Sequence, residues 1–237
     1  MKKIGTLKES SLHRALKFQY SGDGGSIEKV SGPFVCDACT KDGELIEVQT
    51  GSFGPLKEKA KSLCKKSKLR IIHPIIVQKT IELYDASGRR LLHRRKSPKK
   101  GSPWDLFNVL IYAPELPLLK NLTIELALIN AVEKRLDDGA GSWRRKGVSI
   151  ADRFLGPCPA SLQVPSNEYN SIVLKTLKDY RQFLPFRKNE SFTARSLAEK
   201  AGISAVIARK TLYVLANIGL AQHTGKQGRA FVYTRSF

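Results

Sequence analysis

The sequence feature that most constrains the fold is a long apolar, β-branched run over residues 69–83, with the centre Arg70-Ile-Ile-His-Pro-Ile-Ile-Val. β-Branched residues favour strands, and a continuous apolar run of this kind is typical of a buried strand. Pro74 interrupts the run and cannot donate to a strand ladder. We therefore expect one buried strand that passes into another, followed by residues 91–94 as the return arm of a hairpin.

The segments around this run alternate between strand and helix patterns. We expect helices over residues 9–19, 56–66, 105–116 and 148–155, and strands over residues 27–32, 34–38, 45–50 and 122–132. Such alternation indicates an α/β layer fold. A chain of 237 residues with 41% hydrophobic residues is large enough to bury a sizeable core without disulfides.

The charge balance points to a polyanionic partner. The formal net charge is +20, and nucleic acid is the usual partner of so basic a globular chain. Two dense clusters stand out, although a solvated basic surface is the plain alternative; their central residues are Arg94, Arg95, Lys96, Arg144 and Arg145. No apolar run approaches the ~18 residues of a membrane span, and no signal-peptide pattern opens the chain, so we expect a cytoplasmic protein.

Prolines at positions 157, 159 and 165 divide the sequence, and we expect domains over residues 1–160 and 166–237. The second domain begins with a predicted helix over residues 170–184. Thr193 can cap a second helix that ends at Gly202, and Ser204 can cap a third that ends at Gly219. Residues 220–224 and 229–234 then form a predicted hairpin.

This order of short helices and a hairpin resembles the winged-helix DNA-binding domain, and the run Leu197-Ala-Glu-Lys-Ala-Gly-Ile-Ser204 resembles its helix-turn core. The resemblance implies that the third helix enters the major groove and that the hairpin contacts phosphates. The expected DNA-binding residues of this domain are Arg209, Lys210, Tyr213, Asn217, Lys226 and Arg229.

Acidic residues on apolar elements are the candidates for chemistry in the first domain. Asp37 and Glu47 lie on neighbouring predicted strands, and Glu9 lies on the apolar stripe of the first helix. A two-residue turn would set Asp37 opposite Val48. A three-residue loop with Gly43 in the left-handed region would set Asp37 opposite Glu47. We expect the three-residue loop, because it gathers the carboxylates.

These residues resemble the PD-(D/E)XK nuclease superfamily, which places an Asp on one strand, Glu-x-Lys on the next and often an acid on the preceding helix. The resemblance implies a restriction-endonuclease-like mixed sheet flanked by helices, and metal-dependent DNA cleavage. Asp37, Glu47 and Glu9 would ligate Mg²⁺ or Mn²⁺. Gln49 stands where the family usually has Lys, and Lys57 on the next helix is a candidate for the missing charge. The whole chain is also similar to a bacterial group that combines this core with a winged helix.

Two functions therefore remain open. The first is a DNA endonuclease targeted by a winged helix, with Asp37, Glu47, Gln49 and Lys57 as catalytic residues. The second is a non-catalytic DNA-binding regulator, in which Asp37 and Glu47 pair with nearby Lys or Arg and the nuclease-like domain is a scaffold. DNA is the expected partner in both, and a homodimer is left open.

Overall fold

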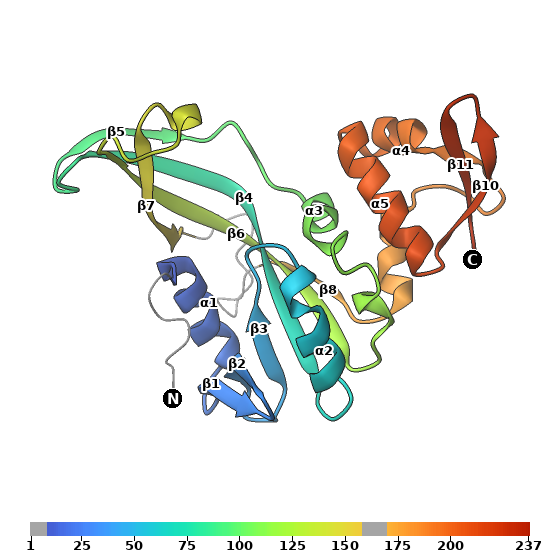
Figure 1. Cartoon of the computed structure of the whole chain (residues 1–237), viewed down its shortest axis with the longest axis horizontal. Helices are drawn as coiled ribbons and strands as arrows, with labels where there is room; N and C mark the ends of the chain where they lie inside the picture. Colours follow the sequence, from blue (N-terminus) through green and yellow to red (C-terminus); the bar gives the residue numbers. More distant parts are fainter. Residues whose placement is uncertain (1–8, 158–169) are drawn as a thin grey trace.

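The computed structural model describes residues 9–157 and 170–237, which form an eight-stranded mixed sheet flanked by helices and a smaller three-stranded sheet (Figure 1). The main path of the large sheet runs β1-β2-β3-β4-β6-β7, with β5 paired to β4 and β8 paired to β6. The predicted mixed α/β class is confirmed.

The first elements follow the predicted order. Helix α1 (Ser11–Ser21) precedes the antiparallel strands β1 (Ser26–Ser31), β2 (Phe34–Cys39) and β3 (Leu45–Val48). Helix α2 (Lys57–Leu63) then connects β3 to β4 (Leu69–Asp85), which runs parallel to β3. A connection between parallel strands needs such a crossover helix. Helices α1 and α2 cover different parts of this sheet, and the hydrophobic residues divide into two core clusters accordingly.

Strand β4 is one continuous strand of 17 residues, so the predicted break at Pro74 is wrong. The pairing of β4 with β3 ends at Ile72, and its pairing with β5 (Leu91–Lys96) begins at Thr80. Between these points β6 (Leu122–Asp137) is the one described strand that pairs with β4. A proline is tolerated where one side of a strand lacks a partner. The predicted hairpin return arm at residues 91–94 is confirmed as β5.

Residues 148–155 form strand β7 (Val148–Leu155), not the predicted helix. This strand pairs antiparallel with β6, and two of its side chains bind partners far away in sequence. Arg153 Nε donates to Glu133 on β6 at 2.9 Å, and Asp152 accepts hydrogen bonds from Ser11 at the start of α1. These tertiary contacts outweigh the local helical pattern. The helix predicted at 105–116 is present but shorter, as α3 (Leu106–Leu110).

The chain returns to the large sheet before the second unit begins. Strand β8 (Ser171–Leu174) pairs with β6, and a 3-10 helix follows at Leu177–Phe183, so the predicted helix over residues 170–184 is wrong. The predicted domain boundary, between residues 160 and 166, lies outside the described residues. The predicted boundary prolines 159 and 165 lie outside the described residues.

The C-terminal unit, residues 192–237, follows its predicted order closely. It contains β9 (Phe192–Thr193), α4 (Ala194–Ala201), α5 (Ala205–Asn217), β10 (Ala221–Gln227) and β11 (Ala230–Arg235). Thr193 and Ser204 cap the two helices as predicted, and Gly202 ends α4 with φ 63°. Its core is continuous with that of the large sheet, since Leu197 and Leu215 belong to the same cluster as Phe107 on α3.

Candidate functional site

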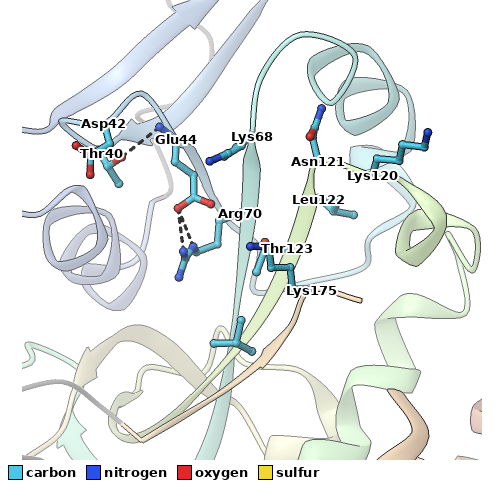
Figure 2. A pocket seen from close by; sticks show the side chains of 11 residues that line it. Thr40, Asp42, Glu44, Lys68, Arg70, Lys120, Asn121, Leu122, Thr123 and Lys175 are labelled. Atoms are coloured by element: carbon cyan, nitrogen blue, oxygen red, sulfur yellow. Dashed lines mark hydrogen bonds and ion pairs between the residues drawn. The ribbon is translucent and has the colours of Figure 1, made fainter. Parts of the chain in front are cut away.

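The loop between β2 and β3 sets the register that matters for the acidic residues. The amide of Gly43, at φ 83°, donates to the Thr40 carbonyl, and the amide of Thr40 donates to the Glu44 carbonyl. Ala38 then pairs with Ile46. Glu44 also binds Arg70 of β4 at 2.9 Å (Figure 2). The predicted three-residue loop and its register are thus confirmed, and this register sets Asp37 opposite Glu47.

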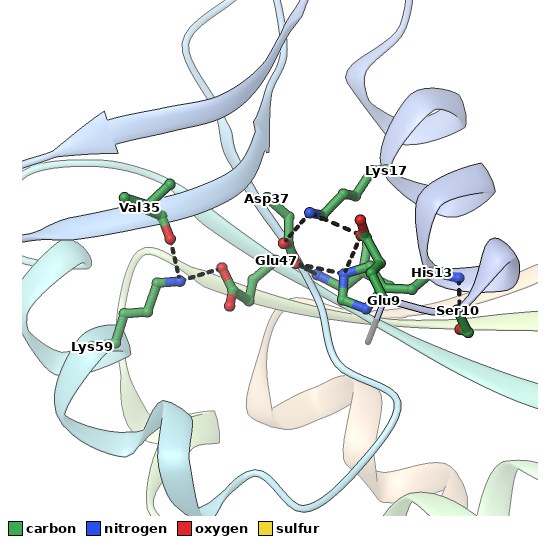
Figure 3. Close-up of polar contacts among 9 residues, drawn as sticks. Glu9, Ser10, His13, Lys17, Val35, Asp37, Glu47 and Lys59 are labelled. Atoms are coloured by element: carbon green, nitrogen blue, oxygen red, sulfur yellow. Dashed lines mark hydrogen bonds and ion pairs between the residues drawn. The ribbon is translucent and has the colours of Figure 1, made fainter. Parts of the chain in front are cut away.

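The Asp37 carboxylate is held by α1 (Figure 3) and by the last residue of β3. Oδ1 binds Lys17 Nζ at 3.0 Å, and Oδ2 lies 3.1 Å from His13 Nε2 and 2.8 Å from the Val48 amide. Burial alone would raise the pKa of Asp37, but the hydrogen bonds from His13, Val48 and Lys17 together lower it below its ordinary value. Asp37 therefore favours its ionised form.

Glu47 is only 9% exposed and is held from the α2 side. Lys59 Nζ lies 2.5 Å from Glu47 Oε2 and donates to the Val35 carbonyl at 2.8 Å. Burial raises the pKa of Glu47, and the negative charge of Asp37 raises it further, against the opposing effect of Lys59. Two adjacent acids whose pKa values shift in opposite directions are a common feature of acid–base sites, although ion-pair networks show it too.

Glu9 joins the same cluster, because its Oε1 lies 2.9 Å from Lys17 Nζ and 3.7 Å from His13 Nε2. The structure therefore brings the three predicted metal ligands into one polar cluster, as Figure 3 shows. It also gives each acid a lysine partner, which is the pairing expected under the non-catalytic alternative.

The cluster as arranged does not fit a divalent cation. Both oxygens of Asp37 face a cationic or N–H donor group, and Lys59 covers Glu47 Oε2. Within residues 9–157 and 170–237, no group of three or more His, Cys, Asp or Glu side chains is placed to hold a metal ion. Mg²⁺ prefers an octahedral shell of oxygen ligands, so Lys17 and Lys59 would have to withdraw before it could bind.

Two predicted catalytic residues make other contacts. Lys57 Nζ binds Glu115 at 2.5 Å, and Gln49 Nε2 donates to the Ser52 carbonyl at 2.6 Å. Two lysines that the sequence prediction missed reach the acids instead: Lys17 binds Asp37 and Glu9, and Glu47 is bound by Lys59. Its position was readable, because Lys59 falls on the helical stripe formed by Leu56, Ala60 and Leu63, which are all buried.

The two predicted basic clusters of the first domain are exposed. Every residue of β5 is exposed, including Arg94, Arg95 and Lys96. Arg94 contacts Glu82 on the neighbouring strand at 3.3 Å. Arg144 and Arg145 lie in a 3-10 helix beside Trp143, whose side chain is 83% exposed.

The C-terminal unit presents some of its predicted DNA-binding residues to solvent. Arg209, Tyr213 and Asn217 are exposed on α5, and Lys226 and Arg229 are exposed on and beside the strands β10 and β11. Lys210 differs from the prediction, because it is only half-buried and its Nζ donates to Asn108 Oδ1 on α3 at 2.8 Å. This contact ties α5 to the first unit.

The fold and this site define a mixed α/β protein with a buried acid–lysine cluster and a small C-terminal helix-and-hairpin unit. Residues 10–163 match the family described as a domain of unknown function, DUF8091, and the chain belongs to that family. A protein of Treponema pallidum (strain Nichols), described as uncharacterized, is 29% identical over 232 residues, which are 98% of this chain and 87% of the relative. No solved structure matches the chain. None of the described helices is both long and apolar enough to cross a membrane.

Proposed function

We propose that the protein is a cytoplasmic DNA-binding protein whose basic edge strand β5 and C-terminal unit hold duplex DNA. The observation that carries this proposal is β5 itself. It is an exposed strand with three consecutive basic residues, Arg94, Arg95 and Lys96, in a chain of net charge +20. Such a concentration of like charge repels itself unless a polyanion neutralises it.

The C-terminal unit supports the same proposal. Strand β9 precedes the two helices and pairs with β11, and the hairpin β10–β11 follows them. This is the arrangement expected for a winged helix, with α5 as the helix that would enter the major groove. Arg209 and Tyr213 lie on its exposed face, while Arg229 in the hairpin turn is suited to a phosphate contact.

The test is duplex binding measured by fluorescence anisotropy over a range of salt concentrations. Phosphate neutralisation predicts a linear fall of log K with log salt, with a slope of about −0.9 for each phosphate contacted. Replacing Arg94, Arg95 and Lys96 with Glu should weaken binding and flatten the slope. A matched triple replacement of exposed lysines elsewhere, Lys65, Lys66 and Lys178, should have a smaller effect. Equal losses from both triples would contradict a specific role for β5.

A second candidate function, a metal-dependent DNA endonuclease, is favoured by a different observation. The order α1-β1-β2-β3-α2-β4 agrees with the order of elements that the resemblance to the PD-(D/E)XK superfamily implies, and Asp37 and Glu47, the acids that the resemblance points to, lie on neighbouring strands in the predicted register. In this proposal Lys59 supplies the positive charge of the family's usual lysine, because this chain has Gln49 at that position. The ion pairs of the acids with Lys17 and Lys59 weigh against it.

Plasmid cleavage separates the two candidates. The wild-type protein, Asp37→Asn and Glu47→Gln are incubated with supercoiled DNA and Mg²⁺ or Mn²⁺. Nicking by the wild type that both variants lose would establish the endonuclease. Absence of nicking by the wild type, together with DNA binding retained in both variants, would support the non-catalytic protein. Circular dichroism of each variant shows whether it is folded.

A further inference from the structure

A polar cavity lies at the end of the large sheet where β4 and β6 begin, beyond the β2–β3 loop (Figure 2). Its volume is about 360 Å³, which is within the size range of pockets for small ligands. Its wall comes from separate segments: the β2–β3 loop, the starts of β4 and β6, and the end of β8. None of the residues in the acid–lysine cluster lines it.

Cationic groups converge on this cavity. Lys68 precedes β4, Arg70 lies on β4 and Lys175 follows β8, and all three line the cavity; Figure 2 shows the Arg70 guanidinium turned to the Glu44 carboxylate. Lys120 also lines the cavity, but its side chain points away. The sequence prediction did not single out any of these residues.

The Arg70 guanidinium is fixed in place rather than free. Nε donates to Glu44 at 3.0 Å, and Nη1 donates to Glu125 at 2.7 Å. Glu125 is buried and also accepts a hydrogen bond from Tyr20 at 2.9 Å. A guanidinium has five N–H donors, so Arg70 retains donors beyond those that bind the two acids.

The two lysines differ from Arg70, because they are exposed and have no ion-pair partner in residues 9–157 and 170–237. Thr40, Thr123 and Asn121 add further polar groups to the wall, and Asp42 and Glu44 add two carboxylates, of which Glu44 is paired with Arg70. An anion that entered would meet two free ammonium groups beside a rigid guanidinium. Phosphate oxygens bind such groups through charge-assisted hydrogen bonds.

We infer that this cavity is a binding site for a phosphate-bearing anion, held by Lys68, Lys175 and Arg70. A cavity of this size accepts a pyrophosphate or nucleotide as well as the terminal phosphate of a nucleic-acid strand. The shared chemistry is a multiply charged phosphate group. The site does not depend on the proposed DNA-binding surface, since neither β5 nor α5 contributes to its lining.

The first experiment measures pyrophosphate and ADP binding by isothermal titration calorimetry with the full chain. Lys68→Ala, Lys175→Ala and the double variant are compared with Lys66→Ala and Lys178→Ala, which remove the same charge from exposed positions outside the cavity. Loss of one charge-assisted hydrogen bond should weaken binding by roughly tenfold for each cavity lysine. Arg70 is not replaced, because its removal would leave Glu44 and Glu125 without their ion-pair partner.

A second arm distinguishes the sources of the phosphate. Short single-stranded oligonucleotides with a 5′-phosphate or a 5′-hydroxyl are compared on the wild type and the double variant. A preference for the phosphorylated strand that the double variant loses would identify a strand end as the ligand. Tight pyrophosphate or ADP binding without that preference would identify a free nucleotide or diphosphate. Failure of every probe to bind, or equal losses in the control variants, would overturn the inference.

Discussion

Lys59 is the cationic partner of Glu47, the most buried acid of the cluster. It neutralises Glu47, whose carboxylate is otherwise buried beside the charge of Asp37. Breaking a buried ion pair by removing one partner leaves an uncompensated charge, so Lys59→Met should lower the free energy of unfolding by about 3 kcal/mol at pH 7. Lys57→Met, two residues away on the same helix, removes a more exposed pair with Glu115 and should cost much less than Lys59→Met, because solvent screens an exposed ion pair.

The pH dependence of the Lys59→Met effect has a definite sign. Without Lys59, the pKa of Glu47 should rise further above its unfolded value, because burial and Asp37 both act in that direction. The destabilisation should then be full above that raised pKa and shrink as Glu47 is protonated at lower pH. Urea unfolding at pH 7.5 and at pH 4.5 measures it. A difference from wild type that stayed constant with pH would contradict this account of Glu47.

Glu133 provides a second test at the residue scale. Its fully buried carboxylate binds Arg135, Arg153 and Lys79. Burial alone would raise the pKa of Glu133, but hydrogen bonds from these three residues lower it to about 2. Because the folded pKa lies below the unfolded value, the stabilisation is full above about pH 4.3 and is lost as the pH falls toward 2.

The ionised Glu133 carboxylate therefore adds about 3 kcal/mol to the free energy of unfolding above that pH, because its pKa lies roughly two units below the unfolded value. Guanidinium unfolding of the wild type and Glu133→Gln between pH 6 and pH 2.5 measures it. The wild type should lose this stability on acidification, and the difference between the two proteins should narrow with it. Parallel curves over the whole range would show that Glu133 does not carry the pH dependence.

At the scale of elements, the start of α5 depends on one hydroxyl. Ser204 Oγ accepts a hydrogen bond from the Ile207 amide at 3.3 Å. Ser204→Ala should destabilise the protein by about 1 kcal/mol, whereas Ser204→Asn retains an N-cap acceptor and should cost little. Thermal unfolding compares the overall stabilities, and hydrogen exchange at Ile207 reports the local effect. Equal losses for Ala and Asn would rule out a capping role.

Local signals of this kind explain which elements the sequence predicted well. The caps at Thr193 and Ser204 and the glycine at position 202 act within one helical turn, so their effects are readable from neighbouring residues. The β2–β3 register was predicted on a different ground, because the local residues allowed a two-residue or a three-residue turn and only the three-residue loop, which the structure has, gathers the carboxylates. The order of elements along the chain from α1 to β4 was also predicted from the alternation of helix and strand patterns.

The elements that the sequence analysis predicted wrongly depend on partners that are distant in the sequence. Residues 148–155 form a strand because β6 lies beside them and Glu133 binds Arg153, and neither contact is encoded nearby. Residues 171–174 likewise form a strand only against β6. In the site, the acids were predicted and the place of Lys59 on the apolar stripe of α2 was readable. The pairing of Lys17 and Lys59 with the acids was not, since it forms only after α1 and α2 have packed on the sheet.

At the scale of the whole molecule, α5 is shared between two roles. Its core face packs into the cluster that also holds Phe107 and Phe183, and Lys210 binds Asn108 on α3. Helix α5 therefore joins the C-terminal unit to the large sheet while also offering Arg209 and Tyr213 to solvent. On α5, the surface proposed for DNA is only the part that α3 leaves open, as the contact of Lys210 with Asn108 shows.

This arrangement predicts unequal contributions from two adjacent basic residues to duplex binding. Arg209→Ala should weaken binding and reduce the salt slope by about one, as expected for the loss of one phosphate contact. Lys210→Ala should have a smaller effect, because Asn108 already holds the Lys210 ammonium group at 2.8 Å. In an Asn108→Ala background Lys210 is released, so Lys210→Ala should then cost as much as Arg209→Ala. Anisotropy titrations of the single and double variants complete this cycle. If Lys210→Ala already matched Arg209→Ala with Asn108 present, the contact with α3 would not restrict how α5 meets DNA.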